Sequence, residues 1–324
     1  MEQLKIRTVD MHAGGEPCRI VMEGLPEIKG ATMREKQEFI RQNYDYIRTS
    51  LMLEPRGHKN MFGAFLLPPC HEEADFGALF MFGSNFEDMC GHATICISTM
   101  LVDRGLVRVT EPETVIRLDT PAGVVEATVR VEGGRARSVS LVNVPSFLYA
   151  KQVVIPTAAH GEVKADIVYA GNPFLLLDAD LVGEIEPQNG PRFIEFAKDV
   201  IAHAKDGCRF VHPDLGELPL VIAEFYKGDR NVVVFGDGQI DRSPCGTGTG
   251  ARVVHLHEAG QLALGADFRH HGIVGTEMIG RIIGETKVGD FPAYITRISG
   301  TGTVVADSLF YIGEDDPLYK GFVL

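Results

Sequence analysis

Two cysteines occupy matching sequence settings in the two halves of the chain, and a thiol can accept or donate a proton. Cys90 opens the run Cys-Gly-His-Ala-Thr, and Cys245, 155 positions later, opens Cys-Gly-Thr-Gly-Thr. After each cysteine the chain has a glycine at the next position, a threonine at the fourth, a leucine at the eleventh and a glycine at the fifteenth. This pattern indicates a diverged repeat, with two similar lobes that each place one thiol at the start of a helix. Two thiols facing each other across a cleft could take a proton from one face of a carbon and return one to the other face.

The start of a helix is a suitable place for such a thiol. The free backbone amides and the helix dipole favour the thiolate, so we expect a pKa below the usual value of about 8.5 and closer to neutrality. Gly91 and Gly246, which follow the cysteines, allow the backbone to approach a ligand closely, and their N–H groups can form an anion site. An amino-acid carboxylate fits such a site. When the Cα proton leaves, charge flows into that carboxylate, and fixed N–H dipoles stabilise the transition state.

Two ionisable residues lie beside the cysteines in the sequence. Asp241, four residues before Cys245, could pair with a substrate ammonium group, and His92, two residues after Cys90, could hydrogen-bond a substrate oxygen or a thiolate. Each also has a structural interpretation. Asp241 could be a carboxylate that caps a loop, and His92 could be a helix-start histidine satisfied by the backbone. Taken alone, each residue favours its structural interpretation.

The other motifs argue against a metal or a cofactor. His255 and His257 are two positions apart on a predicted helix and therefore point to different faces. The run 246–250 is rich in glycine but lacks the Lys-Ser/Thr pair that completes a phosphate-binding loop. The chain contains no Cys-x-x-Cys pair for zinc and no nicotinamide-binding fingerprint after a strand. We therefore expect no metal site and no cofactor.

Four segments have the pattern of helices. They are residues 32–51, 91–104, 191–207 and 246–259. Thr32 and Glu35 form a capping box at the start of the first segment. The second segment is apolar nearly all round, which predicts a buried helix. Gly105 and Gly260 follow the two helices that begin at the cysteines, and each glycine can supply the left-handed residue that ends a helix.

Strand-like segments dominate the rest of the chain. Residues 124–131 and 138–144 flank a Gly-Gly turn and predict a hairpin, and residues 293–299 and 304–312 flank another glycine-rich turn. Many strands around one buried helix, twice over, predict an α+β protein with two lobes rather than a doubly wound sheet. We place the boundary between the lobes after residues 143–147.

Composition and charge narrow the class of protein. The chain has 324 residues, of which 45% are hydrophobic and 23% charged, which suits two globular lobes with sizeable cores. The net charge of −13 argues against binding to nucleic acid or to anionic membranes. No stretch has the length of a membrane span, and the N-terminal residues lack a signal-peptide pattern. Six scattered cysteines predict reduced thiols and a cytoplasmic location.

Several blocks of this sequence resemble the proline racemase family. Met-Cys-Gly-His at 89–92 and Asp-Arg-Ser-Pro-Cys-Gly-Thr-Gly-Thr at 241–249 are similar to the two signature blocks of that family. Further similar blocks occur in order at residues 10–16, 53–58, 61–63, 143–147 and 315–317. The resemblance therefore extends over most of the chain.

The resemblance implies an α+β fold like that of diaminopimelate epimerase. Such a fold has two pseudo-symmetric lobes, each of strands wrapped around a central helix, with the active site in the cleft between them. It also implies that the C-terminal segment returns to the first lobe. The expected lobes are then 1–147 with about 303–324, which carries Cys90, and 148–302, which carries Cys245. A homodimer is implied as well.

The resemblance also implies roles for individual residues. Cys90 and Cys245 would be the acid–base pair, with no cofactor. Asp241 would contact the ring nitrogen of the substrate. Four residues would hold the substrate carboxylate through backbone amides: Gly91, His92, Gly246 and Thr247.

Members of the family act on proline, 4-hydroxyproline or trans-3-hydroxyproline. The dehydratases typically replace the second cysteine with threonine, whereas this chain keeps Cys245. The epimerases tend to place a small residue, a histidine and a cysteine around the ring, and these positions align with Phe62, Ile222 and Phe235. Three apolar side chains leave a 4-hydroxyl group unpaired at a cost of about 1–3 kcal/mol. We therefore expect an unsubstituted proline ring, although both phenylalanines could also be ordinary core residues.

The hypothesis from the sequence is a cofactor-independent racemase that interconverts L- and D-proline. The alternatives within the family are a 4-hydroxyproline 2-epimerase, a racemase for another amino acid and, less favoured, a trans-3-hydroxyproline dehydratase. An alternative from another class is a non-catalytic protein in which Cys90 and Cys245 form a redox switch or a metal clip. Ala93, Gly250 and the segments 82–88 and 170–173 depart from the usual family pattern near the inferred site, and they bear on the choice of substrate.

Overall fold

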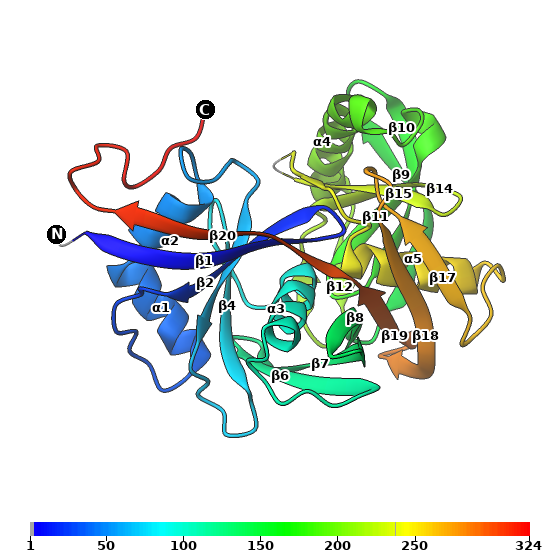
Figure 1. Ribbon diagram of the computed structural model, residues 1–324. Coiled ribbons are helices and arrows are strands. Elements are labelled where there is room, and N and C mark those ends of the chain that lie inside the picture. Colours follow the sequence, from blue (N-terminus) through cyan, green and yellow to red (C-terminus); the bar gives the residue numbers. More distant parts are fainter. Residues whose placement is uncertain (1–2, 237) are drawn as a thin grey trace. The chain divides into compact units, whose positions relative to one another are not determined.

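The computed structural model describes residues 3–236 and 238–324, and the chain divides into two compact units (Figure 1). Unit 1 comprises residues 1–140 and 301–324, and unit 2 comprises residues 141–300. The chain thus enters unit 2 once and returns to unit 1 at its C-terminal end.

Unit 1 is built from strands of mixed direction. Its strands are β1 (Leu4–Ala13), β2 (Glu16–Glu23), β3 (Phe62–Leu67), β4 (Phe76–Phe82), β5 (Phe86–Glu87), β6 (Glu113–Thr120), β7 (Gly123–Glu132) and β20 (Gly302–Ile312), and β8 (Arg135–Val142) leads into unit 2. The antiparallel pairs are β1–β2, β1–β20, β3–β4, β4–β5 and β6–β7. The parallel pairs are β2–β3 and β4–β6.

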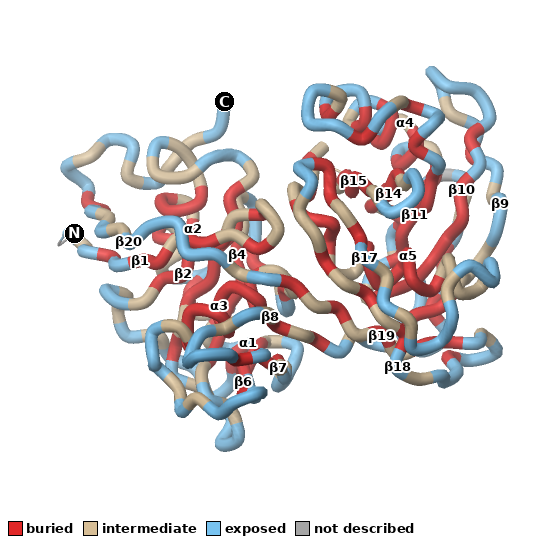
Figure 2. The backbone as a smooth tube through the Cα atoms, turned by 45° about the vertical axis from the view of Figure 1, so that its right-hand side comes forward, coloured by how far each residue is buried: buried red, intermediate tan, exposed pale blue. Residues whose placement is uncertain are grey.

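The central helix of unit 1 is α3 (Gly91–Asp103), which packs against β1, β2, β7 and β20. Every residue from Ala93 to Val102 is buried, so no face of this helix is left for solvent (Figure 2). Gly105, with φ +64°, follows the end of the helix in the left-handed conformation. The prediction of a buried helix ended by a glycine is confirmed.

The prediction of one helix from Thr32 toward Leu51 is wrong in one respect. Thr32 caps the first helix as expected, since its Oγ1 accepts a hydrogen bond from Glu35 N at 3.1 Å. The helix then breaks at Tyr44, which has φ −137°, and two helices result, α1 (Met33–Asn43) and α2 (Asp45–Met52). The buried guanidinium of Arg48 binds Asp45 in the first turn of α2 and the carbonyls of Phe82 and Gly83, so it holds the start of α2 at the end of β4.

Unit 2 has the same mixed construction. Its strands are β9 (Phe147–Thr157), β10 (Gly161–Tyr169), β11 (Pro173–Asp178), β12 (Phe210–His212), β13 (Gly216–Leu218), β14 (Ile222–Lys227), β15 (Arg230–Phe235), β16 (Ile240–Asp241), β17 (Asp267–His271), β18 (Glu277–Val288) and β19 (Phe291–Gly300). The antiparallel pairs are β9–β10, β10–β11, β12–β13, β14–β15, β15–β16, β17–β18 and β18–β19. The parallel pairs are β11–β14 and β15–β17.

Two helices of unit 2 agree with the predictions. α4 (Gly190–Gly207) covers β9, β14 and β15. Its predicted apolar residues are all buried: Phe193, Ala197, Val200, Ile201 and Ala204. α5 (Gly246–Glu258) packs against β9, β10, β18 and β19 and is followed by Gly260 with φ +71°. Arg252, in the middle of α5, is also buried, so this helix is central to unit 2 as α3 is to unit 1.

The two units repeat one order of elements, as the matching cysteine segments predict. In unit 1 the order is β2, helices, β3, β4, β5, α3, β6 and β7. In unit 2 it is β11, α4, β14, β15, β16, α5, β17 and β18, with the β12–β13 hairpin inserted after α4. The parallel and antiparallel pairs correspond one by one, and α3 and α5 each contain 13 residues. The repeat therefore extends well beyond the cysteine segments.

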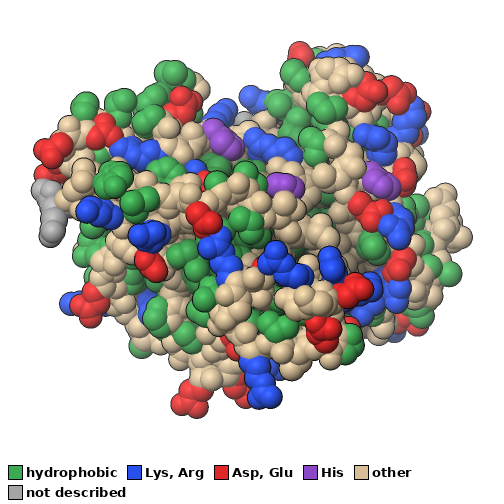
Figure 3. Space-filling model, viewed as in Figure 1, with side chains coloured by type: hydrophobic (Ala, Val, Ile, Leu, Met, Phe, Trp, Pro, Cys, Tyr) green, Lys and Arg blue, Asp and Glu red, His purple; other side chains and the backbone are tan. Residues whose placement is uncertain are grey.

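The glycine-rich turn after Ser299 does not join neighbours within one unit. β19 pairs with β18 in unit 2, whereas β20 pairs with β1 in unit 1, so this turn is where the chain changes units. Ten rungs join β20 to β1, from Leu4–Ile312 to Ala13–Gly302, and they tie the C-terminal strand into unit 1. On the face shown in Figure 3, acidic and basic side chains are interspersed. None of the described helices is both long and apolar enough to span a membrane.

Candidate active site

Cys90 lies at the N-cap of α3 in an ordinary extended conformation, with φ −141°. Its backbone oxygen accepts hydrogen bonds from Thr94 N at 3.0 Å and from Thr94 Oγ1 at 2.8 Å. Its sulfur lies 3.3 Å from Nδ1 of His92, and the residue is 6% exposed. The sequence pattern thus places an imidazole within hydrogen-bonding reach of this thiol.

Phe62 joins this group from the first position of β3. Its ring meets the edge of the His92 ring at 4.9 Å and stacks on the Phe82 ring at 5.7 Å. Phe62 and Phe82 are opposite one another on β3 and β4, so the pair covers the end of this ladder. Sequence reasoning missed Phe82, because its role follows from strand register and not from a local motif.

Cys245 occupies the equivalent N-cap of α5 but has a strained backbone. Its φ is +63°, a region that residues other than glycine rarely adopt and that costs about 1–3 kcal/mol. Cys245 N donates to Ser243 Oγ at 3.0 Å, and Ser243 donates from N and Oγ to Asp241 Oδ1 at 2.8 and 2.7 Å. The sulfur accepts from Gly248 N at 3.4 Å and lies 3.5 Å from Thr247 Oγ1.

The environment of Cys245 keeps its sulfur protonated. Burial and the negative charge of Asp241 raise the pKa of the Cys245 thiol well above its usual value, despite opposing hydrogen bonds from Thr247 and Gly248. The expectation that the helix start lowers this pKa is therefore wrong. One amide and one hydroxyl cannot offset the loss of water around the thiol of a residue that is 6% exposed. The buried Cys245 side chain therefore favours the thiol over the thiolate.

Asp241 serves the loop that carries Cys245. Burial raises the pKa of its carboxyl, and the hydrogen bonds from Ser243 partly counter that effect. Oδ1 accepts both bonds from Ser243, which is the loop-capping arrangement that the sequence allowed. A contact between Asp241 and a substrate nitrogen remains a prediction.

Ile222 and Phe235 lie directly opposite one another, at the first position of β14 and the last of β15. They belong to the same apolar cluster as Cys245, Ile222 as a buried member and Phe235 as a partly buried neighbour. In the repeat, Ile222 corresponds to Phe62 at the start of β3, and Phe235 corresponds to Phe82 at the end of β4. Both units therefore present an apolar pair at the same strand ends.

The predicted site residues form two groups, one in each unit. In unit 1 they are Cys90, Gly91, His92 and Phe62; in unit 2 they are Cys245, Gly246, Thr247, Asp241, Ile222 and Phe235. Gly91 and Gly246 are the first residues of α3 and α5. Open space lies where a Cβ of Gly246 would project, with no atom within 4 Å, so a ligand can reach this backbone. Each group thus combines a thiol with the first turn of a buried helix.

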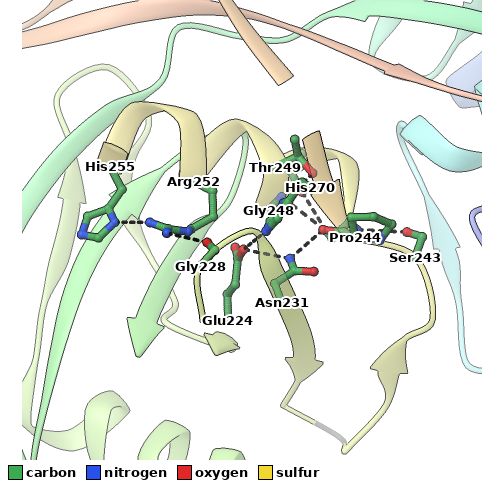
Figure 4. Close-up of polar contacts among 12 residues, drawn as sticks. Glu224, Gly228, Asn231, Ser243, Pro244, Gly248, Thr249, Arg252, His255 and His270 are labelled. Atoms are coloured by element: carbon green, nitrogen blue, oxygen red, sulfur yellow. Dashed lines mark hydrogen bonds and ion pairs between the residues drawn. The ribbon is translucent and has the colours of Figure 1, made fainter. Parts of the chain in front are cut away.

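A buried polar network next to Cys245 was not found from the sequence (Figure 4). Asn231 Nδ2 donates to Glu224 Oε1 and to the carbonyl of Pro244, both at 2.8 Å. Thr249 Oγ1 lies 3.0 Å from His270 Nδ1, and His270 Nε2 lies 3.8 Å from Glu224 Oε1. The sequence does carry a signal for this network, because Glu224 and Asn231 are a charged and an amide residue within largely apolar strands.

Glu87 is the counterpart of Asp241 in unit 1. It pairs with Phe80 on β4, as Asp241 pairs with the equivalent Val233 on β15. Burial raises the pKa of the Glu87 carboxyl to about 7. In each unit, therefore, a carboxyl group lies just before the cysteine in the sequence and pairs with the equivalent position of the neighbouring strand.

Within residues 3–236 and 238–324, no three His, Cys, Asp or Glu side chains are arranged to hold a metal ion.

Comparisons with known proteins agree with this architecture. The sequence model of the proline racemase family matches residues 8–323. A proline racemase from Clostridioides difficile is 42% identical over 328 residues, covering 98% of both chains. A 4-hydroxyproline 2-epimerase from Streptosporangium roseum is 39% identical, covering 98% of this chain and 97% of the relative. A trans-3-hydroxy-L-proline dehydratase from Burkholderia ambifaria is 37% identical, covering 98% of both chains.

Solved structures show the same fold. A hydroxyproline epimerase from Agrobacterium vitis with bound trans-4-hydroxy-L-proline has a TM-score of 0.84 at 31% identity, covering 99% of this chain and 96% of that one. A phenazine biosynthesis protein of the PhzF family from Bacillus anthracis has a TM-score of 0.61 at 15% identity, covering 96% and 99%. The predicted fold class, α+β and like diaminopimelate epimerase with two similar lobes, is confirmed. The chain belongs to the proline racemase family and is an isomerase that acts on amino acids.

Proposed function

We propose that this enzyme interconverts L- and D-proline by transferring a proton between two cysteines, without a cofactor. The observation that carries the proposal is the equivalence of Cys90 and Cys245, each of which directly precedes the 13-residue central helix of its unit. The relative from Clostridioides difficile, a proline racemase, supports the choice of substrate at 42% identity. The proposal includes a homodimer, which rests on the family resemblance alone, and a cytoplasmic location, which rests on the six scattered cysteines.

The proposed reaction begins with Cys90 as a thiolate beside His92. Its sulfur takes the Cα proton of one enantiomer, and the thiol of Cys245 gives its proton to the opposite face of the same carbon. Cys90 ends as the thiol and Cys245 as the thiolate, so the opposite enantiomer is processed with the roles reversed. The raised pKa of Cys245 supports its assignment as the first proton donor.

Binding groups come from both helix starts in this proposal. The amides of Gly91, His92, Gly246 and Thr247 hold the substrate carboxylate, where charge accumulates as the proton leaves. Asp241 accepts a hydrogen bond from the ring nitrogen. Every group that binds the substrate or transfers a proton in this proposal is a side chain or a backbone amide of this chain.

Phe62, Ile222 and Phe235 support the preference for an unsubstituted ring, because none can hydrogen-bond a hydroxyl group. One observation favours the alternative of a 4-hydroxyproline 2-epimerase. Glu87, the counterpart of Asp241, offers a carboxyl group that could accept a hydrogen bond from a ring hydroxyl. The epimerase from Streptosporangium roseum is 39% identical, which keeps this alternative in view. Retention of Cys245 disfavours the dehydratase.

The test combines two variants with a panel of substrates. Cys90→Ser and Cys245→Ser should each lower racemisation of proline by at least about 10²–10⁴-fold, the contribution of a positioned acid or base. Polarimetry measures racemisation, and NMR in D₂O measures exchange of the Cα proton for proline, trans-4-hydroxy-L-proline and trans-3-hydroxy-L-proline. Turnover close to wild type in either variant would contradict the two-cysteine scheme.

Two further measurements test the alternatives. Exchange confined to the hydroxylated substrate would replace the proposed substrate. Thiol titration with and without pyrrole-2-carboxylate, a planar mimic of the deprotonated ring, tests the redox alternative. We expect the mimic to protect both Cys90 and Cys245. A lack of protection would favour a thiol switch.

A further inference from the structure

The two thiols differ in the strain of their backbones. Cys245 has φ +63°, whereas Cys90 has φ −141°, which any residue adopts. A residue keeps a strained conformation only where its surroundings impose it. We therefore expect a set of contacts around Cys245 that has no equivalent at Cys90 in unit 1.

The first of these contacts come from the side chain of Asn231. It is fully buried on β15, and both protons of its Nδ2 are used, one toward Glu224 Oε1 and one toward the carbonyl of Pro244 (Figure 4). Pro244 directly precedes Cys245, so the bond fixes the peptide that leads into the strained residue. Gly272 packs on the same segment, because a Cβ there would lie 2.7 Å from Ser243 C and 2.8 Å from Pro244 N.

Glu224 makes contacts on both sides of Cys245 in the sequence. It acts on Pro244 through Asn231, and it lies beside Gly248. Its Oε1 holds Asn231, and its Oε2 lies 2.9 Å from where a Cβ of Gly248 would be. Gly248 is the residue whose N–H donates to the Cys245 sulfur. Burial raises the pKa of the Glu224 carboxyl to about 8, against the hydrogen bond from Asn231 and the charge of Arg252, so the group is a neutral acid at pH 7.

The repeat supplies an internal comparison. Glu224 is the third residue of β14, where unit 1 has Ala64, and Asn231 sits on the rung where unit 1 has Ala78. Both alanines are fully buried, so unit 1 has no polar group at either position. Unit 2, in which the backbone of Cys245 is strained, has the polar pair at these positions. Unit 1, in which the backbone of Cys90 is relaxed, has two alanines.

We propose that Asn231 and Glu224 are positioning residues that hold Pro244 and the first turn of α5 so that Cys245 keeps its strained conformation and its sulfur stays directed for proton transfer. The catalytic half of this statement rests on the proposed function. The structural half, that the pair controls the state of the Cys245 thiol, stands without it.

The test uses Asn231→Ala, Glu224→Ala and the neutral isostere Glu224→Gln in the full chain. Alkylation by iodoacetamide is followed at each cysteine by mass spectrometry, with Cys90 as the internal reference because both cysteine residues are 6% exposed. Loosening the turn admits water to a thiol that burial keeps protonated, so in both alanine variants the Cys245 rate relative to Cys90 should rise about tenfold. The turnover number for proline should fall at least about tenfold with KM little changed, since a 1 Å misplacement can cost about 10²-fold.

Glu224→Gln is the conservative variant and should keep both measurements within about threefold of wild type, because it preserves a neutral acceptor for Asn231. Val200→Ala, a buried change on α4, is the matched control for destabilisation and should leave the ratio of alkylation rates unchanged. Should Asn231→Ala fail to fold, Asn231→Leu, which keeps most of the volume, takes its place.

An unchanged ratio in a folded Asn231 variant would overturn the proposal, as would damage from Glu224→Gln equal to that from Glu224→Ala. If the ratio changes but the wild-type enzyme racemises no proline, the positioning role stands and the proposed function fails. The alkylation readout thus separates the two.

Discussion

Glu224 makes the stability of this protein depend on pH in a direction opposite to that of an ordinary carboxyl group. Its side chain is fully buried, and burial raises its pKa from 4.5 to about 8. Between these values the folded state binds a proton that the unfolded state has lost, so stability falls as the pH rises. The stabilisation is complete below about pH 4.5 and is lost as the pH passes through about 8.

The magnitude follows from the shift. At about 1.36 kcal/mol for each pKa unit, the full change is about 5 kcal/mol, of which about 3–4 kcal/mol falls between about pH 5 and pH 8. Glu224→Gln removes the titration and keeps the hydrogen bond to Asn231. The free energy of unfolding of wild type, minus that of the variant, should therefore decrease by about 3–4 kcal/mol over this range.

Urea unfolding followed by far-UV circular dichroism measures this difference, since the chain has no tryptophan to serve as a fluorescent probe. Both proteins are measured at the same series of pH values, so the titration of every other group cancels. A difference that stays flat with pH would show that Glu224 does not titrate as its burial requires. A difference that grows with pH would show an ionised, paired carboxylate and would refute the reasoning.

Two further predictions test the packing and the choice of substrate. Gly280→Ala should destabilise the protein by about 1–3 kcal/mol in urea unfolding, because its Cβ would lie 2.7 Å from Val253 Cγ1 on α5, whereas Gly284→Ala on the same strand, with its nearest atom at 3.8 Å, should cost much less. Equal costs would contradict the close approach. Glu87→Gln should leave proline racemisation within about threefold of wild type; a loss confined to 4-hydroxyproline would instead identify Glu87 as the partner of a ring hydroxyl and favour the epimerase.

The central helices could be predicted from the sequence because their signals are local. A run without a polar face predicts burial, and Gly105 and Gly260 adopt the left-handed conformation that a glycine after a helix allows. The match between the two cysteine segments predicts the repeat, which the strand pairings extend over most of each unit. For each helix the deciding residues lie within one segment of the sequence, and the repeat is visible because the two cysteine segments match position by position.

The features that could not be predicted depend on residues far apart in the sequence. The position of α2 after the break at Tyr44 depends on Arg48 binding the carbonyls of Phe82 and Gly83, which lie more than thirty positions away. The high pKa of Cys245 follows from burial that the fold completes. A helix start alone favours a thiolate, and only the packed structure shows that desolvation has the larger effect.

The asymmetry of the two thiols bears on what such an enzyme can gain from it. L- and D-proline have equal free energies, so the ratio kcat/KM must be the same for both enantiomers however unlike the two units become. Under the proposed function, the network at Cys245 therefore cannot favour one direction of the reaction. What it can set is the resting state of the free enzyme: with Cys245 protonated, the form ready to react has its base at Cys90. That resting state does not by itself make kcat or KM differ between the enantiomers. The two constants differ, in the same proportion, only where the network also makes the two substrate complexes unequal in free energy.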